Sequence, residues 1–235
     1  MNYYIGVTEK QDIFTIMGGR VKIRRGIYNP TSDAVWLAAF INDTPKTVLD
    51  VGTGTGAVAL CLMARIPNIK MTALDISSDM LNAARENFAL NNQTAEFINT
   101  DIMTWRTNKT FDLVVTNPPY FHGMPAKHNA HHNTNLNLWT RRCIARTRPN
   151  GIFATIVDVA AMVPVIAEMS AHCGDIKILP LFSNKNVAER VLLSARVGRA
   201  PHSQIFKGIS MNNAEILRHG KSISEILQTY TKKSH

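Results

Sequence analysis

The sequence predicts an α/β protein: a doubly wound, seven-stranded, mostly parallel sheet preceded by an N-terminal β-hairpin. From Lys46 onward, apolar runs of strand length alternate with runs of helical spacing, which is the order of a parallel sheet. The chain has 235 residues, of which 45% are hydrophobic and 18% are charged, enough for one large core. No apolar run reaches the roughly 18 residues of a membrane-spanning helix, so contact with a membrane is not expected.

A β-hairpin is predicted close to the N-terminus. Ile13–Ile16 and Val21–Ile23 are short β-rich runs on either side of Met17-Gly18-Gly19-Arg20, and a Gly-Gly pair between such runs favours a hairpin. Because side chains alternate along a strand, three cations are expected on one face of the second arm, where they would meet a polyanion: Arg20, Lys22 and Arg24.

A short helix is predicted between the hairpin and the sheet. Thr31, Ser32 and Asp33 are helix-capping residues, and the apolar run Ala34–Phe40 follows them. The hairpin and this helix form a predicted extension over residues 1–45, ahead of the main domain over residues 46–235. We expect the two parts to make a single compact unit.

Strands and helices alternate through the main domain. The predicted strands are Thr47–Val51, Lys70–Leu74, Glu96–Ile98, Phe111–Thr116, Ile152–Val157, Ile176–Leu179 and Arg190–Val197. The predicted helices cover about residues 56–66, 79–91, 135–147, 159–172 and 213–228. Ser77 or Ser78 is expected to cap the second of these helices.

A glycine-rich loop follows the first strand of the main domain. Asp50-Val51-Gly52-Thr53-Gly54-Thr55-Gly56 places an acidic residue before three alternate glycines, and a helix begins next. The glycines permit a tight turn and let a ligand approach bare backbone at the helix N-terminus. We expect a nucleoside cofactor to contact Gly52, Thr53, Gly54 and Gly56.

Acidic residues at the ends of neighbouring strands extend this site. Ligands of doubly wound sheets bind at the carboxyl ends of the strands, so Asp50, Asp75 and Asp101 are expected to reach one crevice. Asp75 would accept hydrogen bonds from two ribose hydroxyls, and Asp101 would accept one from an adenine amino group. Ile76 and Ile102 would form apolar walls around that ring.

The loop leaves two cofactors open. Gly52 to Ala57 also fit the NAD-binding pattern G-x-G-x-x-(G/A), with Asp75 about twenty residues further on. Asp50, ahead of the first glycine, favours S-adenosylmethionine because a carboxylate there can engage the amino-acid end of that molecule. The residues downstream decide between the two.

Asn117-Pro118-Pro119-Tyr120 follows the apolar strand Phe111–Thr116 and is the most specific motif of the chain. Two prolines fix φ and remove two N–H groups, which leaves backbone carbonyls with no donor between them. The Asn117 side-chain carbonyl and the Pro118 carbonyl are expected to form a rigid pair of acceptors, beside the flat ring of Tyr120.

Such a pair suits a planar, conjugated amine such as the exocyclic nitrogen of adenine. Acceptors that hold both N–H bonds localise the lone pair and stabilise the positive charge that develops as the nitrogen attacks a methyl group. No strong general base is needed, because the proton becomes acidic only after attack. Tyr120 and Phe121 would stack on a base that has left its own stack.

The net charge of +9 belongs to the second half of the chain. Residues 1–120 hold 11 Lys/Arg and 11 Asp/Glu, whereas residues 121–235 hold 15 Lys/Arg and 6 Asp/Glu. Clustered cations are the pattern of a nucleic-acid partner, since each neutralised phosphate releases counterions. Lys127 and Arg142 are predicted phosphate contacts in this half.

Histidines and cysteines give no metal or disulfide signal. No convincing tetrahedral set is formed by the histidines that follow the Asn-Pro-Pro-Tyr motif, so no metal is expected: His122, His128, His131 and His132. The widely spaced cysteines are expected to be buried thiols in a reducing cytoplasm: Cys61, Cys143 and Cys173. The first residues show no basic region followed by an apolar stretch that would suggest secretion.

Together these motifs resemble the class I, Rossmann-like methyltransferases, and in particular the bacterial tRNA(Val) adenine-N(6) methyltransferase family. The resemblance covers nearly the whole chain, from Gly26–Asp33 through Asn117–Phe121 and Glu189–Leu192 to Asn213–Gly220. It implies S-adenosyl-L-methionine as cofactor and a tRNA adenine near the anticodon as target. The target amine would be held by the motif residues Asn117, Pro118, Pro119 and Tyr120.

Other functions stay open. A release factor glutamine methyltransferase would act on an equally planar amide, but that family carries a separate helical N-terminal domain, and only about 45 residues precede the first strand of the main domain here. A DNA adenine methyltransferase would be expected to carry an inserted sequence-reading domain. A non-catalytic RNA-binding scaffold would not need the intact motifs. The sequence favours an RNA adenine methyltransferase, as a monomer rather than a dimer.

Overall fold

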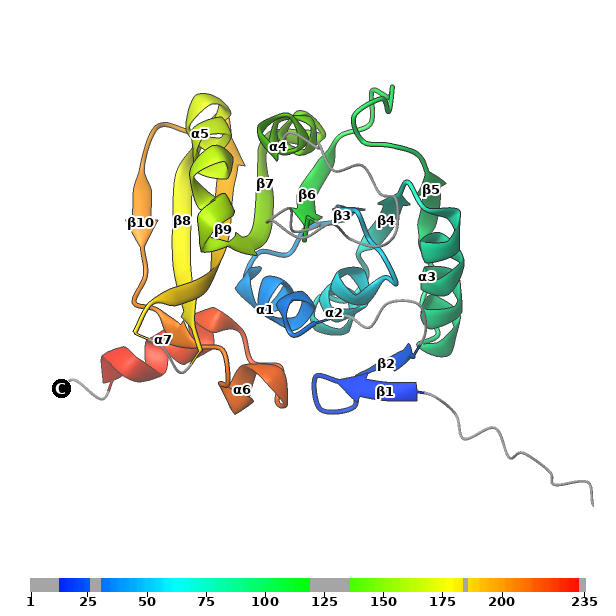
Figure 1. Ribbon diagram of the computed structural model, residues 1–235, viewed down its shortest axis with the longest axis horizontal. Coiled ribbons are helices and arrows are strands. Elements are labelled where there is room, and N and C mark those ends of the chain that lie inside the picture. The colour runs from blue at the N-terminus through cyan, green and yellow to red at the C-terminus, as the bar shows by residue number, and fades with distance from the viewer. Residues whose placement is uncertain (1–12, 26–30, 119–135, 184–185, 233–235) are drawn as a thin grey trace, which may run out of the picture.

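A nine-stranded sheet with helices on both faces forms the centre of the computed structural model, which describes residues 13–25, 31–118, 136–183 and 186–232 (Figure 1). The seven predicted strands are all present: β3 (Thr47–Val51), β4 (Lys70–Asp75), β5 (Glu96–Asn99), β6 (Phe111–Thr116), β7 (Thr147–Asp158), β8 (Cys173–Phe182) and β9 (Ala188–Val197). Two short additional strands, β10 (Ser203–Ile205) and β11 (Ile209–Ser210), pair with β8. All three residues of β10 are exposed, so the sequence has no alternation of apolar and polar residues that would predict this strand.

The strand order is β10-β8-β9-β7-β6-β3-β4-β5, which confirms the doubly wound prediction. From β3 the chain winds outward through β4 to β5 and then crosses back to β6, on the other side of β3. β9 is antiparallel to both of its neighbours, β7 and β8. The carboxyl ends of β3, β4, β5 and β6 therefore meet at one edge of the sheet, with the switch point between β3 and β6.

Two hydrophobic cores, one on each face of the sheet, explain the long apolar strands. Val48 and Leu113 pack with the helices of one face, whereas their chain neighbours Leu49 and Val114 pack with the helices of the other. Strands buried on both faces read as continuous apolar runs in the sequence.

The helices are divided between these two faces (Figure 1). The first core includes residues from α1 (Asp33–Phe40), α2 (Ala57–Arg65) and α3 (Ser78–Leu90). The second includes residues from α4 (Leu136–Ala145) and from α5 (Met162–His172), which follows a single 3₁₀ turn, Val159–Ala161. Ser77 is the cap of α3, since its hydroxyl accepts a 3.3 Å hydrogen bond from the Met80 N–H.

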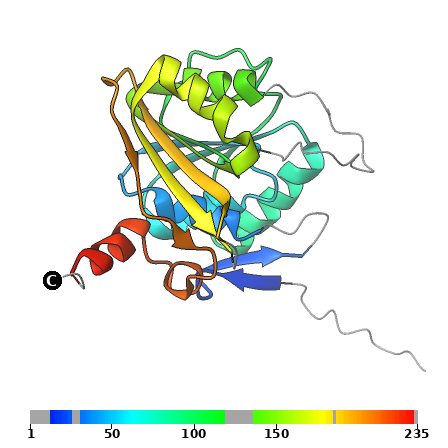
Figure 2. The ribbon, with the colours of Figure 1, turned by 60° about the vertical axis from the view of Figure 1, so that its left-hand side comes forward.

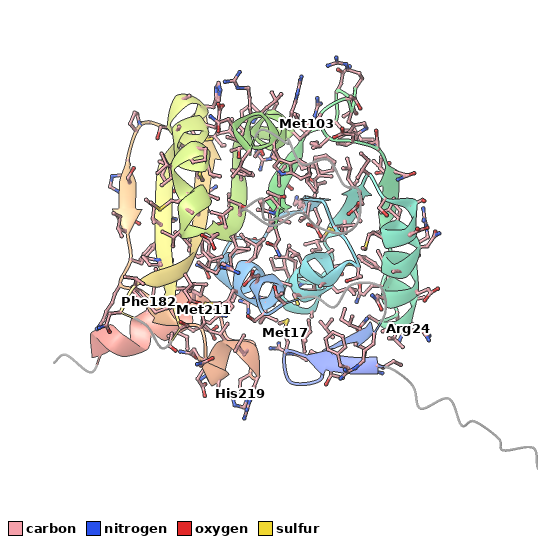
Figure 3. All side chains as sticks on the ribbon, viewed as in Figure 1. Met17, Arg24, Met103, Phe182, Met211 and His219 are labelled. Carbon is pink, nitrogen blue, oxygen red and sulfur yellow. The ribbon has the colours of Figure 1, made fainter. Side chains whose placement is uncertain are left out.

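The predicted hairpin is present as β1 (Ile13–Ile16) and β2 (Val21–Arg24), and its Val21 and Ile23 side chains enter the first core. The expectation of three cations on one strand face was wrong for Arg20, which lies in the turn before β2. Its Nε donates to the Met17 carbonyl (3.2 Å) and its Nη2 to the His219 carbonyl (2.8 Å). Met17 and His219 lie near one another in Figure 3. Arg20 thus joins the hairpin to the C-terminal segment, while Lys22 and Arg24 are exposed.

The helix predicted over residues 213–228 is two helices, α6 (Ala214–Leu217) and α7 (Ile223–Lys232), which lie on the side of the molecule that carries the hairpin (Figure 2). Gly220 between them has φ +61°, a left-handed conformation that ends the helical run. The Gly220 carbonyl accepts a 2.6 Å hydrogen bond from Arg65 Nη1 of α2, which holds the break in place. Residues of the hairpin, of α1 and of α6 and α7 share the first core, and the boundary drawn near residue 45 stays a prediction.

Candidate active site

The glycine-rich loop is docked onto the end of β4. The N–H groups of Gly52 and Thr53 both donate to the Leu74 carbonyl, at 2.8 and 3.0 Å. Asn87 of α3 holds the other side of the loop through a 3.0 Å hydrogen bond from its Nδ2 to the Thr55 carbonyl. Gly52, Gly54 and Gly56 have φ of +69°, +55° and +84°, so the turn needs all three glycines for its left-handed conformations.

Two of these glycines serve different purposes. A Cβ at Gly56 would lie 2.8 Å from Phe88 Cε2 and 3.5 Å from the Ala84 Cβ, so Gly56 lets the start of α2 pack against α3. A Cβ at Gly54 would meet no atom of the described residues within 4 Å. The backbone at Gly54 therefore faces open space that a ligand can occupy.

Alanine substitutions should separate the two roles. Gly56→Ala is expected to lower the free energy of unfolding by about 3 kcal/mol, because a left-handed alanine is strained and its methyl group collides with Phe88. Gly54→Ala should cost only about 1 kcal/mol from strain but weaken donor binding, because its methyl group enters the open space. Urea unfolding and calorimetric binding of S-adenosylhomocysteine measure the two effects. Wild-type donor affinity in Gly54→Ala would rule out a donor site against the Gly54 backbone.

Asp75 organises the start of two helices from the end of β4. Its Oδ2 accepts from the Gly54 N–H (2.8 Å) and its Oδ1 from the Ser77 N–H (2.9 Å). A carboxylate oxygen has two lone pairs, so each can still accept a ribose hydroxyl. Ile76 is 55% exposed, which leaves an apolar surface beside this carboxylate.

Asp50 is a buried acceptor that the described residues do not satisfy. It is 1% exposed, and its Oδ2 accepts the Thr53 hydroxyl at 2.8 Å. Its Oδ1 has no hydrogen-bond partner within the described part of the chain. Burial, opposed by the Thr53 hydrogen bond, raises the pKa of Asp50 to about 7. An unsatisfied acid of this kind fits the ammonium end of an amino-acid ligand.

The raised pKa of Asp50 predicts a pH dependence of stability. The Asp50 carboxyl has a pKa of about 7 in the folded state and the ordinary value of 3.8 in the unfolded state. Between these two pH values the folded carboxyl keeps its proton, whereas the unfolded one has lost it. The folded state therefore binds more protons in this window, and its stability falls as pH rises. Relative to Asp50→Asn, the wild type should lose about 2 kcal/mol between about pH 5.5 and about pH 8. Urea unfolding of both proteins checks this, and parallel pH curves would contradict it.

Asp101 and Ile102 follow β5 and differ in their access to a ligand. Asp101 Oδ1 accepts from the Met103 N–H at 2.9 Å, so this carboxylate caps the loop after the strand. Its Oδ2 has no hydrogen bond among the described residues. Ile102 is 1% exposed and packs in the second core, so its side chain does not form the wall predicted from the sequence. The exposed Ile76 is the apolar residue at this edge.

Trp139 of α4 is a site residue that the sequence did not reveal. Its Nε1 donates to the Thr116 hydroxyl at 3.2 Å, and that hydroxyl donates to the Val51 carbonyl at 2.8 Å. A Cβ at Gly52 would lie 3.5 Å from Trp139 Cζ2, so the indole ring covers the first glycine of the loop. The chain of hydrogen bonds ties α4 to the ends of β6 and β3, directly before Asn117. From the sequence, an aromatic residue in an amphipathic helix is expected to belong to the hydrophobic core. The contact of Trp139 with the glycine loop is visible only from the way α4 packs in the folded protein.

The structure describes the first half of the Asn-Pro-Pro-Tyr motif. Asn117 is half-buried and Pro118 is buried, at the carboxyl end of β6 next to the glycine loop on β3. Asp50 lies near the end of β3, Asp75 ends β4, and Asp101 and Asn117 follow β5 and β6, so the four residues lie at the edge of the sheet where these carboxyl ends meet. Outside the described residues lie the remaining predicted site residues and the histidine cluster: Pro119, Tyr120, Phe121, Lys127, His122, His128, His131 and His132.

Three further features of the described residues concern the cysteines, the metal-binding side chains and the length of the apolar helices. Cys61, Cys143 and Cys173 are buried free thiols, as predicted. Residues 13–25, 31–118, 136–183 and 186–232 contain no group of three metal-binding side chains. None of the helices described is both long and apolar enough to cross a membrane.

Comparisons with known proteins agree on one class of enzyme. The family model described as methyltransferase small domain matches residues 31–137. A tRNA1(Val) (adenine(37)-N6)-methyltransferase of Glaesserella parasuis serovar 5 is 29% identical over 194 residues, 79% of this chain and 77% of that protein. A release factor glutamine methyltransferase of Deinococcus radiodurans is 48% identical over 73 residues, 31% of this chain and 26% of that protein. The solved N-methyltransferase NodS of Bradyrhizobium japonicum, in complex with S-adenosyl-L-homocysteine, has the same fold, with a TM-score of 0.55, 13% identity, and 70% of this chain and 84% of NodS covered.

The matched segment contains the parts that the geometry singles out. Residues 31–137 run from the start of α1 to the start of α4 and include the glycine loop, Asp75, Asp101 and the Asn-Pro-Pro-Tyr motif. The resemblance to tRNA(Val) adenine-N(6) methyltransferases, inferred from these motifs, is confirmed by the long alignment. The choice between NAD and a methyl donor, which the glycine loop left open, is decided for the donor. The chain therefore has the fold of the class I methyltransferases and matches a methyltransferase small domain over residues 31–137, and its cofactor is S-adenosyl-L-methionine.

Proposed function

We propose that this enzyme methylates the exocyclic N(6) amine of an adenine in RNA, with a tRNA, close to its anticodon, as the substrate. The observation that carries the proposal is the extent of the alignments. Two relatives named for tRNA1(Val) align over 79% and 74% of this chain, well beyond the 31–137 segment, whereas the relatives named for a release factor align over 31% to 50%. The cytoplasmic location expected from the sequence follows from this substrate and stays a prediction, as does the monomeric state.

The described residues support separate roles for the residues that would bind the methyl donor and those that would bind the target amine. The donor supplies an electrophilic methyl group when it is bound. Asp50 would hold its amino-acid end and Asp75 its ribose, as their unsatisfied and remaining lone pairs permit. Asn117 and Pro118 would present two carbonyl acceptors to the adenine amine. These acceptors would stay aligned during the attack because the prolines are rigid.

Trp139 would hold the acceptor residues in position relative to the methyl donor. Its hydrogen bond to Thr116 fixes the residue before Asn117, and its ring closes the site over Gly52. A fixed strand end matters because a misplacement of about 1 Å can cost about a hundredfold in rate. Tyr120 and Phe121 are proposed to stack on the target base.

The competing proposal is a release factor glutamine as substrate. Its amide nitrogen is also planar, so the same acceptor pair would serve, and the 48% identity over 73 residues favours it at the level of the shared motifs. A DNA adenine would fit the acceptors equally well. Substrate identity therefore has to be tested with all three candidates side by side.

Transfer of labelled methyl from S-adenosylmethionine to unmodified tRNA, duplex DNA and release factor protein tests the proposal. Nuclease digestion and mass detection identify the product, and Asn117→Ala serves as the blank. We expect N(6)-methyladenine in the tRNA alone. Label in the release factor alone, or in DNA alone, would replace the proposed substrate with that one.

A further inference from the structure

Ion pairs occupy many cations of the basic second half. Arg141 makes two hydrogen bonds of 3.0 Å to the Glu168 carboxylate, and Arg148 pairs with Asp112. More pairs of the same kind are Arg190 with Asp33 and Asp158, Arg196 with Asp43 and Asp175, and Lys221 with Glu215. A guanidinium group that already holds a carboxylate has less to gain from a phosphate, so these residues are poor candidates for an RNA contact.

Three arginines between α4 and the connection from β5 to β6 are different. Arg142 lies in the last turn of α4, and Arg146 lies in the turn that directly follows the end of the helix at Ala145. The Arg146 guanidinium lies 5.6 Å from the centroid of the Trp105 ring, and Arg106 follows Trp105 in the chain. Within the described residues, no carboxylate pairs with Arg106, Arg142 or Arg146, which we name the α4 arginine cluster.

No negatively charged side chain of the described residues balances the cluster. Burial, and then the positive charges of Arg142 and Arg106, lower the pKa of the Arg146 guanidinium. The buried Nε atoms of Arg142 and Arg146 have no acceptor among the described residues, whereas Arg146 Nη1 donates to the Thr107 carbonyl. Like charges held together without a counter-charge are unfavourable, and a phosphate group would relieve that repulsion while accepting hydrogen bonds from the exposed ends of the side chains.

The cluster is continuous with the candidate active site. Trp139 covers Gly52, Arg142 follows it by three residues on the same side of α4, and Arg146 lies in the turn directly after the helix. At a rise of about 1.5 Å per residue, the end of α4 at Ala145 lies about 9 Å along the axis from Trp139, and Arg146 is the next residue. Met103, in the connection from β5 to β6, lies beside α4 in Figure 3 and packs in the core that α4 shares. The cluster thus lies within reach of a nucleotide that neighbours a base in the site.

We propose that the α4 arginine cluster binds backbone phosphates of the substrate RNA next to the target adenine, and so directs the strand along α4. The inference rests on the proposed RNA substrate. Contacts to phosphates carry no sequence information, so they position the strand and make its affinity depend on salt.

The test compares Arg106→Gln/Arg142→Gln with the control Arg199→Gln/Arg218→Gln. Both double variants remove two charges from arginines that pair with no carboxylate among the described residues, and Arg146 is kept because it contacts Thr107 and Trp105. Fluorescence anisotropy with labelled, unmodified tRNA and S-adenosylhomocysteine measures affinity from about 50 to about 200 mM salt. The cluster variant should bind about tenfold more weakly, with a salt slope smaller by about two, and the control should change by less than about twofold. Thermal unfolding and S-adenosylhomocysteine affinity should stay at wild-type values in both.

Two results would overturn the inference. One is wild-type tRNA affinity and salt slope in the cluster variant. The other is an equal loss in the control, which would mean that overall charge, not this cluster, governs binding. A wild-type enzyme that methylates no RNA would overturn the proposed function instead, so methyl transfer by the wild type is measured on the same tRNA.

Discussion

Replacing Asn117 with alanine is expected to lower the rate of methyl transfer about a thousandfold while leaving donor affinity within about twofold of wild type. The physical reason is that the Asn117 carbonyl is proposed to hold the target amine and not the donor. Without it, one N–H bond of that amine loses its acceptor, and the developing positive charge loses a fixed dipole. Single-turnover transfer at saturating donor measures the rate, and calorimetry with S-adenosylhomocysteine measures the affinity.

Asn117→Asp is the matched control for this experiment. It keeps an oxygen acceptor on a side chain of the same length, so it should recover part of the activity that alanine loses. Thr116→Val removes the hydroxyl that links Trp139 to Val51 and should give a smaller loss, because it loosens the strand end without removing the acceptor. A fall in donor affinity for Asn117→Ala that matches the fall in rate would mean that Asn117 belongs to the donor site.

Asp75→Ala is expected to have the opposite signature. Its donor affinity should fall about a hundredfold, because two ribose hydroxyls lose a charged acceptor and the glycine loop loses the hydrogen bond that Gly54 donates. The rate at saturating donor should stay close to wild type, since Asp75 lies at the end of β4 and the acceptor motif follows β6. Equilibrium titration with S-adenosylhomocysteine, followed by transfer assays at several donor concentrations, separates affinity from rate.

Two controls separate the ribose contact from the effect on the loop. Asn87→Ala releases the other side of the loop, at the Thr55 carbonyl, without touching the ribose site, and should cost less than about tenfold in affinity. The 2′-deoxy analogue of S-adenosylhomocysteine should bind the wild type more weakly than the parent compound. Asp75→Ala should not distinguish the two, and a variant that still did so would show that the ribose contacts another residue.

Local patterns in the sequence were sufficient for the sheet and for the chemistry of its edge. The seven strands were found because burial on both faces makes each of them an apolar run, and the three glycines because left-handed turns need them. Topology then brings Asp50, Asp75, Asp101 and Asn117 to one edge, since parallel strands end on the same side. These inferences needed no knowledge of contacts between distant segments.

Contacts between distant segments decided the rest. Arg20 lies next to a strand and was expected to face a polyanion, but its guanidinium group binds the carbonyl of His219, 199 residues away. Ile102 is apolar and next to Asp101, yet it packs inward. The carbonyl of Gly220, at the break between α6 and α7, accepts a hydrogen bond from Arg65 of α2, 155 residues away.

The sequence by itself determined the fold class, the donor loop and the acceptor motif, because each depends on residues that are close in the chain. Only the tertiary structure decided which charges are available and what closes the site. Arg141 and Arg142 are neighbours in sequence, but one meets Glu168 of α5 and the other has no carboxylate partner among the described residues. Trp139 covers Gly52 because α4 packs at the end of β6, and that docking arises from packing across the whole sheet rather than from any local pattern.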